Sequence, residues 1–378
     1  MSPPPLERSD YAALDDGIYL NQASLGLLGR PAVDAMHRFL DEVARHGNRF
    51  MSDADETSYG DALRQRAAEL LHTDRDRIAI ASGASEVLGQ VPLLAPPPDG
   101  GAVVAVATDF PAVTRPWLRL AELGRCRMHW VDDDPQRDLT DDIIEAIDRT
   151  TTHVVVASVQ YATGSRVDIP RLCGATKDAG ARLVVDATQE AGALEIDTDS
   201  WAAADVVVSS GYKWLGGHGG VALAVVERSL LEQAPPLPGW MGAADPFDFD
   251  ATRLSFAEDA RRYTQSTMSY VSMAGLTASL EALLSVGIGA IQAHAAGLAR
   301  RLCDALAPNG WRPFRALDDP SASPHIISLG RGGGDLDHTI RSLRESGVVC
   351  SSRGGRVRVS LAPYNDDSDL EALVSALR

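Results

Sequence analysis

The chain has 378 residues, of which 45% are hydrophobic, so it can bury one large core and a second, smaller one. Its formal net charge of −17 disfavours nucleic acids and anionic membranes as partners, because both are polyanionic. No apolar run approaches the ~20 residues that a membrane-spanning helix needs. The four cysteines have no metal-site or redox spacing, and the first residues carry no secretory signal. We expect a soluble, cytoplasmic protein without a metal centre that acts on small molecules.

The middle of the chain alternates short β-branched runs with amphipathic stretches, the pattern of strands joined by crossover helices. The predicted strands are residues 102–107, 127–131, 153–158, 182–186, 205–209 and 220–226. The helices predicted between strands are residues 85–94, 113–123, 140–147 and 169–179. This alternation predicts an α/β fold with a mainly parallel sheet covered on both faces.

The remainder of the chain has a different pattern. Residues 234–256 form a loop rich in proline, glycine and aspartate, and loops of this length are often functional or interfacial. One long helical stretch is predicted from about residue 270 to 306. The tail then combines short apolar runs and amphipathic stretches, which predicts a small α+β domain: residues 326–329, 336–346, 347–350, 357–361 and 367–377.

Lysine is scarce in this chain. Of 35 basic residues only Lys177 and Lys213 are lysines. Arginine supplies positive charge and ion pairs equally well, but only a primary amine can lose its proton and condense with an aldehyde. Lys213 lies in the glycine-rich run 209–217, directly after a predicted strand, and is the candidate for covalent chemistry. Lys177 lies in a polar helical stretch and is expected at the surface.

Three further signals accompany Lys213. Residues 82–86 form a small-residue turn that opens a helix and offers N–H groups to a phosphate, although a serine there could equally be an ordinary N-cap. Asp186 ends an apolar strand, where open α/β sheets bind ligands, and a helix N-cap is the alternative. Arg358 shares one face of a predicted strand with Arg356 and Ser360, where an arginine is commonly solvated.

In this order, Asp186-Ala187-Thr188-Gln189, Ser210-Gly211-Tyr212-Lys213, and Arg358-Val359-Ser360 followed by Tyr364-Asn365-Asp366 resemble motifs of the pyridoxal-phosphate (PLP) enzymes of aminotransferase class V. That group includes cysteine desulfurases, kynureninases and isopenicillin-epimerase-like proteins. The resemblance covers nearly the whole chain, from residues 19–26 to the terminal helix. It is specific for the superfamily and much less so for the reaction.

The resemblance implies the PLP-dependent transferase fold type I. This fold has a large domain, with a mainly parallel seven-stranded sheet between helices, and a small α+β C-terminal domain. For this chain it implies an N-terminal segment, residues 1–25, that packs on the small domain. Residues 26–265 would form the PLP-binding domain, and residues 266–378 the interdomain helix and the small domain.

The resemblance also implies roles for individual residues around PLP. Lys213 would bind the cofactor covalently, and Asp186 would pair with the pyridine nitrogen, where a carboxylate keeps the ring protonated and electron-withdrawing. Gln189 would hydrogen-bond the phenolic oxygen, and Phe110 would stack on the ring. The phosphate would be held by Ala84, Ser85, Ser210 and Tyr212, together with Thr267 from the neighbouring subunit of a homodimer.

On the substrate side, the resemblance assigns Arg358 to the α-carboxylate of an amino acid, a pairing that suits the forked geometry of a guanidinium. Asn21 and Tyr161 would also contact the substrate. The implied chemistry is that of a PLP-dependent lyase or transferase. It would run through an external aldimine and a quinonoid, with Lys213 as the base at Cα.

The sequence narrows the reaction through Cys350. This cysteine follows the apolar pair Val348-Val349, so we expect it to be strand-bound and buried, unlike the mobile sulfur-accepting cysteine of a desulfurase. Desulfurase-like members of the family that lack this cysteine include C–S lyases of secondary metabolism, so the resemblance implies elimination from a cysteine conjugate or a related amino acid.

Several alternatives stay open at this stage. They are a class V aminotransferase, an amino-acid epimerase, a cysteine desulfurase and a kynureninase-type hydrolase. A nicotinamide-dependent oxidoreductase is disfavoured because no Gly-x-Gly-x-x-Gly turn follows an early strand. A cofactor-retaining binding module is disfavoured by the presence of both Lys213 and Arg358.

Overall fold

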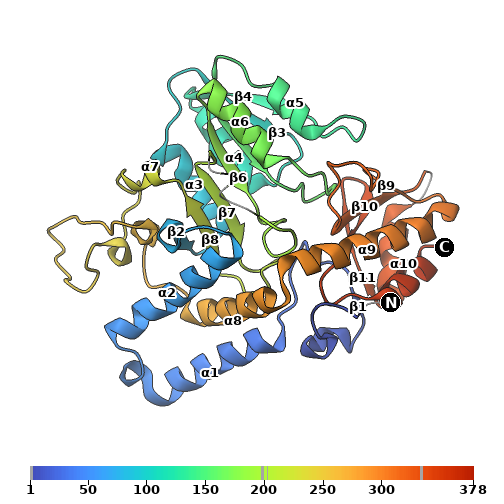
Figure 1. Ribbon diagram of the computed structural model, residues 1–378, viewed down its shortest axis with the longest axis horizontal. Helices are drawn as coiled ribbons and strands as arrows, with labels where there is room; N and C mark the ends of the chain where they lie inside the picture. The colour runs from blue at the N-terminus through green and yellow to red at the C-terminus, as the bar shows by residue number, and fades with distance from the viewer. Residues whose placement is uncertain (1–2, 197–199, 202, 333–334) are drawn as a thin grey trace.

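The computed structural model describes residues 3–196, 200–201, 203–332 and 335–378. A larger part is built on a long sheet and a smaller part on a short one, and α9 (Ile288–Leu306) runs between them (Figure 1). The N-terminal segment, dark blue in Figure 1, lies beside the smaller part.

Among the described residues, seven strands form the larger sheet in the order β2-β8-β7-β6-β5-β3-β4. Strand β8 is antiparallel to both of its neighbours, and all other neighbours in the sheet are parallel. The strands are β2 Ile78–Ala81, β3 Gly101–Val106, β4 Cys126–Val131, β5 Thr151–Ala157, β6 Arg182–Asp186, β7 Val206–Ser210 and β8 Ala222–Val226. The predicted mainly parallel sheet is confirmed, and six of its strands begin and end within two residues of the prediction.

Helices cover both faces of this sheet. Along β3, Val104 and Val106 pack in the core shared with α2, α5, α6 and α8, whereas Val103 and Ala105 pack in the core shared with α3 and α4. Burial on both faces accounts for the valine-rich strands. The helices of the larger part are α1 Arg30–His46, α2 Asp53–Leu70, α3 Ala84–Leu94, α4 Pro111–Glu122, α5 Leu139–Glu145, α6 Ile169–Ala179, α7 Arg228–Leu231 and α8 Tyr270–Val286.

The helical stretch predicted from 270 to 306 is not continuous. It breaks at Gly287, whose φ of +85° lies outside the helical region and is readily adopted only by glycine. The break separates α8, which joins the core of the larger part, from α9, which packs mainly in the core of the smaller part. Among the described residues no single helix is long and apolar enough to cross a membrane. Helices α8 and α9 meet that criterion only as a pair bent by 75°.

The smaller part has the α+β pattern predicted for the tail. Its strands form an antiparallel sheet in the order β12-β13-β10-β9. The elements are β9 Arg312–Pro313, β10 Ile326–Gly330, α10 Leu336–Glu345, β12 Ser351–Arg353, β13 Arg356–Ser360 and α11 Asp367–Ala376. Val357 and Val359 face its core, so alternate residues of β13 face the opposite way.

The N-terminal segment pairs with the smaller part. Strand β1 (Ile18–Tyr19) runs parallel to β11 (Val348–Val349), and the Arg8 guanidinium donates to the Asp369 carboxylate at 2.8 Å. The division into residues 1–25, 26–265 and 266–378 stays a prediction, and within it α8 packs in the core of the larger part. Residues 1–2, 197–199, 202 and 333–334 lie outside the described structure.

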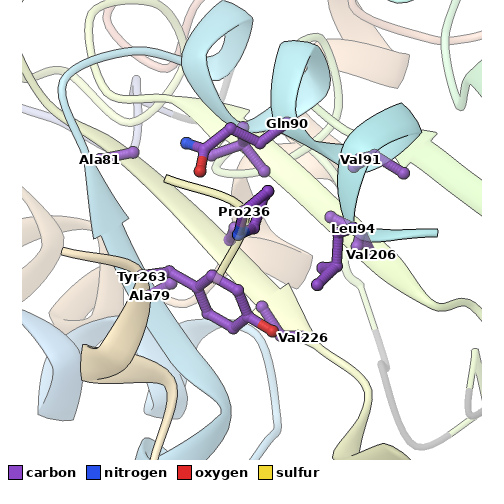
Figure 2. Close-up of a pocket in the computed structure, with 11 residues that line it drawn as sticks. Ala79, Ala81, Gln90, Val91, Leu94, Val206, Val226, Pro236 and Tyr263 are labelled. Carbon is purple, nitrogen blue, oxygen red and sulfur yellow. The ribbon is translucent and has the colours of Figure 1, made fainter. Parts of the chain in front are cut away.

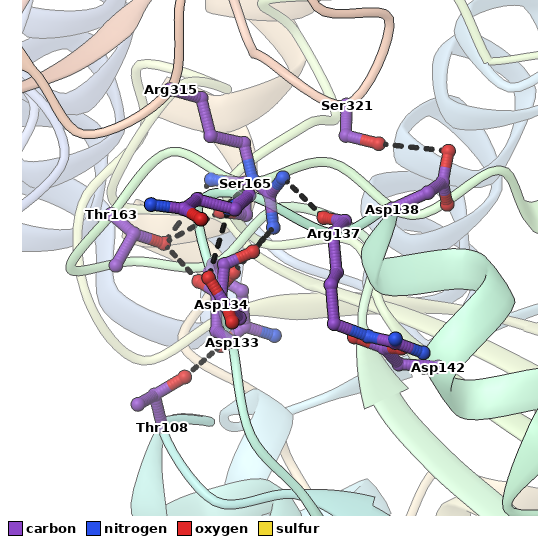
Figure 3. Close-up of polar contacts among 12 residues, drawn as sticks. Thr108, Asp133, Asp134, Arg137, Asp138, Asp142, Thr163, Ser165, Arg315 and Ser321 are labelled. Atoms are coloured by element: carbon purple, nitrogen blue, oxygen red, sulfur yellow. Dashed lines mark hydrogen bonds and ion pairs between the residues drawn. The ribbon is translucent and has the colours of Figure 1, made fainter.

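A buried ion pair joins the two parts (Figure 3). Arg315, which follows β9, donates to Asp133 Oδ1 at 2.8 Å, and the two side chains are 2% and 0% exposed. The same guanidinium donates to Ser165 Oγ at 2.7 Å and to the carbonyls of Arg137 and Asp134 at 2.7 and 2.9 Å. Because its hydrogen bonds are satisfied within the protein, Arg315 serves as a structural clamp.

Replacing the Arg315 guanidinium tests this clamp. Arg315→Met leaves the Asp133 carboxylate buried without its partner, so the free energy of unfolding should fall by about 3–5 kcal/mol. The matched control is Arg228→Met, which removes an exposed ion pair with Asp74 and should cost less than about 1 kcal/mol. Urea unfolding measures both values, and equal losses in the two variants would contradict the assignment.

Candidate active site

A cavity lies at the carboxyl ends of β5, β6 and β7, next to the start of α3. Parallel strands end at one edge of a sheet, which is where open α/β sheets bind ligands. Nine of the twelve predicted site residues line this cavity. The lining is Ala84, Ser85, Phe110, Ala112, Ala157, Val159, Tyr161, Asp186, Thr188, Gln189, Ser210, Tyr212 and Lys213.

Lys213 lies in the turn after β7, and only 7% of the residue is exposed. Its Nζ atom lies 5.3 Å from the centroid of the Phe110 ring. Burial lowers the pKa of the amine to about 8, against the opposing effect of the Asp186 carboxylate. The amine is therefore much closer to its neutral, nucleophilic form than a surface lysine is.

Asp186 ends β6, and its carboxylate accepts a hydrogen bond from the Thr188 backbone N–H at 2.9 Å. The Thr188 hydroxyl in turn accepts from the Ser210 N–H at 3.1 Å, which ties the end of β6 to the end of β7. Burial raises the pKa of Asp186, and these hydrogen bonds and the charge of Lys213 oppose that shift. The acid is held beside the amine by the order of the strands.

The start of α3 is open to the cavity. Its N-cap is Gly83, without a side-chain cap, so the alternative of Ser82 or Ser85 as the N-cap is wrong. Ser82 is occupied elsewhere, since its N–H donates to Glu86 Oε2 at 2.8 Å. Backbone N–H groups of the first helical turn, which Ala84 and Ser85 begin, are left for an anion.

Arg358 on β13 is a buried cation of a different kind from Arg315. It is 1% exposed, and its Nη1 donates to the Tyr161 carbonyl at 2.7 Å. Its Nη2 donates to Asn21 Oδ1 at 3.3 Å and to Ser24 Oγ, while Nε has no partner. Within the described ranges no carboxylate lies within 4 Å of the guanidinium. A buried guanidinium without a carboxylate favours an anionic ligand.

Arg358, its partner Asn21 and Thr267 are the three predicted residues outside the cavity lining, and Gln189 lies in the lining. The Gln189 side chain is already engaged, because Nε2 donates to the Ala23 carbonyl at 3.0 Å and Oε1 accepts from Trp214 Nε1 at 2.7 Å. One Nε2 hydrogen is left for a further acceptor. Thr267 is exposed in the segment before α8 and does not line the cavity of its own chain.

The sequence analysis missed Asp109 and its partner Gln160. Asp109 accepts from Gln160 Nε2 at 2.6 Å and from the Ala157 N–H at 3.0 Å, and it directly precedes Phe110. Burial raises the pKa of Asp109 to about 8. The signal that could have identified it is the one used for Asp186, an acid that follows an apolar strand.

A separate pocket lies between α3 and strands β2, β7 and β8, beside Pro236 (Figure 2). Its lining is almost entirely apolar, and the Tyr263 hydroxyl there already donates to the Leu230 carbonyl at 2.7 Å. This pocket offers no acid, base or nucleophile to a reaction. The cavity with Lys213 is the candidate active site.

The family model described as aminotransferase class V matches residues 18–373. The chain belongs to this family. Cysteine desulfurase CsdA from Escherichia coli K12 is 26% identical over 98% of this chain and 96% of the relative. A kynureninase from Deinococcus radiodurans is 38% identical over 37% of this chain and 34% of its own length.

A solved structure of a cystine C–S lyase, named C-DES and bound to its product cysteine persulfide, is also similar. Its TM-score is 0.87 at 18% identity, covering 97% of this chain and 98% of the other, and this likeness shows the shared fold. The class V family uses PLP, so the chain is a PLP-dependent enzyme.

The groups present in the cavity fit PLP. Lys213 offers an amine for the aldehyde, and Asp186 a carboxylate for the ring nitrogen. Phe110 offers an aromatic face for the ring, and the open start of α3 offers N–H donors for the phosphate. One cavity thus brings together each kind of group that the cofactor needs.

The pKa of Lys213 predicts how the stability of the cofactor-free protein depends on pH. An unfolded lysine titrates near ~10.4, so between about pH 8 and 10.4 the unfolded chain binds more protons than the folded one, and stability rises with pH. Across this range the wild type should gain about 3 kcal/mol relative to Lys213→Met. Urea unfolding at several pH values measures the difference, and a difference that stays constant would contradict the assignment.

Proposed function

We propose that this class V enzyme is a C–S lyase that eliminates a thiol from a cysteine conjugate or a related amino acid. The overall reaction consumes the conjugate and one water, and it releases a thiol, pyruvate and ammonia. The bond that breaks is Cβ–S, and the proton that leaves first is the one on Cα. PLP, when bound, supplies the electron sink for the electrons released at Cα.

The proposal gives the cavity residues the roles that their chemistry allows. Lys213 would hold the cofactor aldehyde through Nζ, and its free amine would accept the Cα proton of the substrate. A pKa of about 8 leaves part of the amine neutral near physiological pH. Asp186 holds a proton at the ring nitrogen. Phe110 stacks on the ring, Gln189 bonds its phenolic oxygen, and the phosphate is held by Ala84, Ser85, Ser210 and Tyr212.

On the substrate side, Arg358 binds the α-carboxylate. Its burial, its unpartnered Nε and the absence of a carboxylate within 4 Å in the described structure support this role. The Tyr161 carbonyl and Asn21 Oδ1 fix the direction of the guanidinium. Substrate is thereby oriented so that its Cα–H bond lies within reach of Lys213.

The environment of Cys350 is the observation that favours elimination over desulfuration. Cys350 connects β11 to β12, and its side chain packs against the core of the smaller part, on the face opposite to Arg358. The prediction of a buried, strand-bound cysteine is wrong in both respects, since the residue is partly exposed and lies between two strands. Packing of the thiol against the core raises its pKa to about 12, against the opposing charge of Arg358, so little thiolate is available to accept sulfur.

The other cysteines do not supply a sulfur acceptor either. Cys126 and Cys173 are buried, and burial raises the pKa of Cys303 on α9 to about 11. Without a sulfur-accepting thiolate, the proposed outcome is loss of the leaving group from Cβ. The similarity to a protein named as a cystine C–S lyase supports the same reading.

The proposal extends to the assembly and setting of the enzyme. We propose a homodimer in which Thr267 of one subunit reaches the phosphate held by the other. Its exposure and its absence from the cavity lining of its own chain are consistent with this role. We also propose a cytoplasmic location and a role in secondary metabolism.

Product analysis tests the reaction. The holoenzyme is incubated separately with cysteine, a cysteine S-conjugate and kynurenine, and pyruvate, ammonia, sulfide and alanine are assayed while the cofactor spectrum is followed. We expect pyruvate and ammonia in equal amounts with released thiol from the conjugate. Alanine with persulfide or sulfide from cysteine would contradict elimination. Accumulated pyridoxamine phosphate would indicate a transaminase, and inversion at Cα without other product an epimerase.

Cys350→Ala serves as the matched variant in this assay, with Cys303→Ala as its control. Both should change kcat/KM for the conjugate by less than about threefold. A loss of kcat/KM of more than about 100-fold in Cys350→Ala alone would identify the cysteine as a sulfur acceptor and would favour a cysteine desulfurase.

A further inference from the structure

A second arginine shares the face of the small sheet that presents Arg358. In the antiparallel pair β12–β13, Ser351 lies opposite Arg358 and Arg353 lies opposite Arg356. Directly opposed residues, and residues two apart on one strand, lie on the same face. Arg353 and Arg358 are therefore diagonal neighbours, about 7–8 Å apart in the ladder, on the face turned away from the core of the smaller part.

The position of Arg353 is fixed by the hairpin that follows it. Gly354 and Gly355 have φ values of +53° and +72°, the two positive values of a tight type I′ turn. This turn sets the register that pairs Arg353 with Arg356. The backbone geometry of the turn thus fixes the position of Arg353 at the end of β12.

The Arg353 guanidinium has no anionic partner within the described part of the chain. Its one hydrogen bond is from Nη1 to the carbonyl of the adjacent Ser352 at 2.7 Å, and the residue is half-buried. Its charge acts on the active site. Burial is the largest cause of the lowered pKa of Lys213, and the charges of Arg358 and Arg353 add to it. The pKa of Arg358 is also lowered, first by burial and then by the charge of Arg353.

Arg356 lies on the same face, and its guanidinium is hydrogen-bonded within the protein. Its Nε donates to the Ser328 carbonyl at 3.2 Å and its Nη2 to the Arg312 carbonyl at 2.8 Å. Its guanidinium lies 5.6 Å from the centroid of the Phe314 ring. Arg356 supports the strand pairing, whereas Arg353 is left with donors to spare.

We infer that Arg353 binds a second anionic group, carried on the side chain of the substrate. The inference rests on the proposed function and narrows its substrate class to amino acids whose sulfur substituent bears a carboxylate or a similar anion. Arg358 takes the α-carboxylate because it is fully buried and aimed by Tyr161 and Asn21. Arg353 is more exposed, in keeping with a group that extends from Cβ toward the mouth of the site.

An isosteric pair of substrates tests this inference on the holoenzyme. S-carboxymethyl-cysteine ends in a carboxylate, and S-carbamoylmethyl-cysteine ends in an uncharged amide of the same shape. We expect the wild type to favour the acid about 10- to 100-fold in kcat/KM and in the dissociation constant measured by calorimetry, the range of a charge-assisted hydrogen bond. Arg353→Gln should abolish the preference for the acid over the amide, because a general effect on the site acts on both substrates alike and cancels in their ratio, while the control Arg356→Gln should keep the preference.

Cleavage and binding together distinguish failure of the anion subsite from failure of the lyase activity. If the acid and the amide are cleaved equally well by the wild type and by Arg353→Gln, the anion subsite is wrong and the lyase activity stands. If neither is cleaved, yet the acid binds more tightly only when Arg353 is present, the subsite stands and the lyase activity fails. Equal binding without cleavage would overturn both.

Discussion

The burial of the Lys213 amine is the constraint around which the site is arranged. Lys213 is 7% exposed, so its amine loses hydration and its pKa falls. The nearby Asp186 carboxylate opposes this fall in the pKa. The turn that carries the lysine is fixed by the N-terminal segment. Gln22 Nε2 donates to the Lys213 carbonyl at 2.9 Å, and a Cβ on Gly26 would lie 2.2 Å from the same oxygen. Residues far apart in the sequence therefore hold the reactive amine in place.

Two buried arginines show how the surroundings decide the role of a side chain. Arg315 has two carboxylates and two carbonyls around it, so its charge is neutralised within the protein and holds the two parts together. Arg358 is equally buried but meets a carbonyl, an amide and a hydroxyl, none of which carries charge. The fold leaves its positive charge for a ligand. A substrate α-carboxylate would complete its environment and would place Cα beside Lys213.

Much of the fold and the site could be predicted from sequence because the signals were local. The valine-rich runs marked β3 to β8, and the difference between an amine and a guanidinium marked Lys213. The sequence prediction missed α1, α2 and β2. For α2 a local signal was present, a capping box in which Ser52 and Asp55 bond each other's backbone N–H groups.

Other features could not be predicted because they depend on long-range contacts. Asp109 acquires its partner only when strand order places β3 beside β5 and brings Gln160 to its carboxylate. The engagement of Gln189 by Trp214 and Ala23 likewise needs three distant segments to meet. At Gly287 the apolar pattern continues through the break, so periodicity alone predicted one helix where backbone geometry makes two.

Covalent trapping of the cofactor tests the central assignment most directly. Lys177 lies exposed on α6 and Lys213 is buried in the cavity, so the chain contains its own control. The holoenzyme is reduced with borohydride and digested, and the modified peptide is located by mass spectrometry. The account predicts phosphopyridoxyl label on Lys213 alone, unchanged in Lys177→Arg and absent in Lys213→Ala. Label on Lys177, or no label while cofactor is bound, would contradict it.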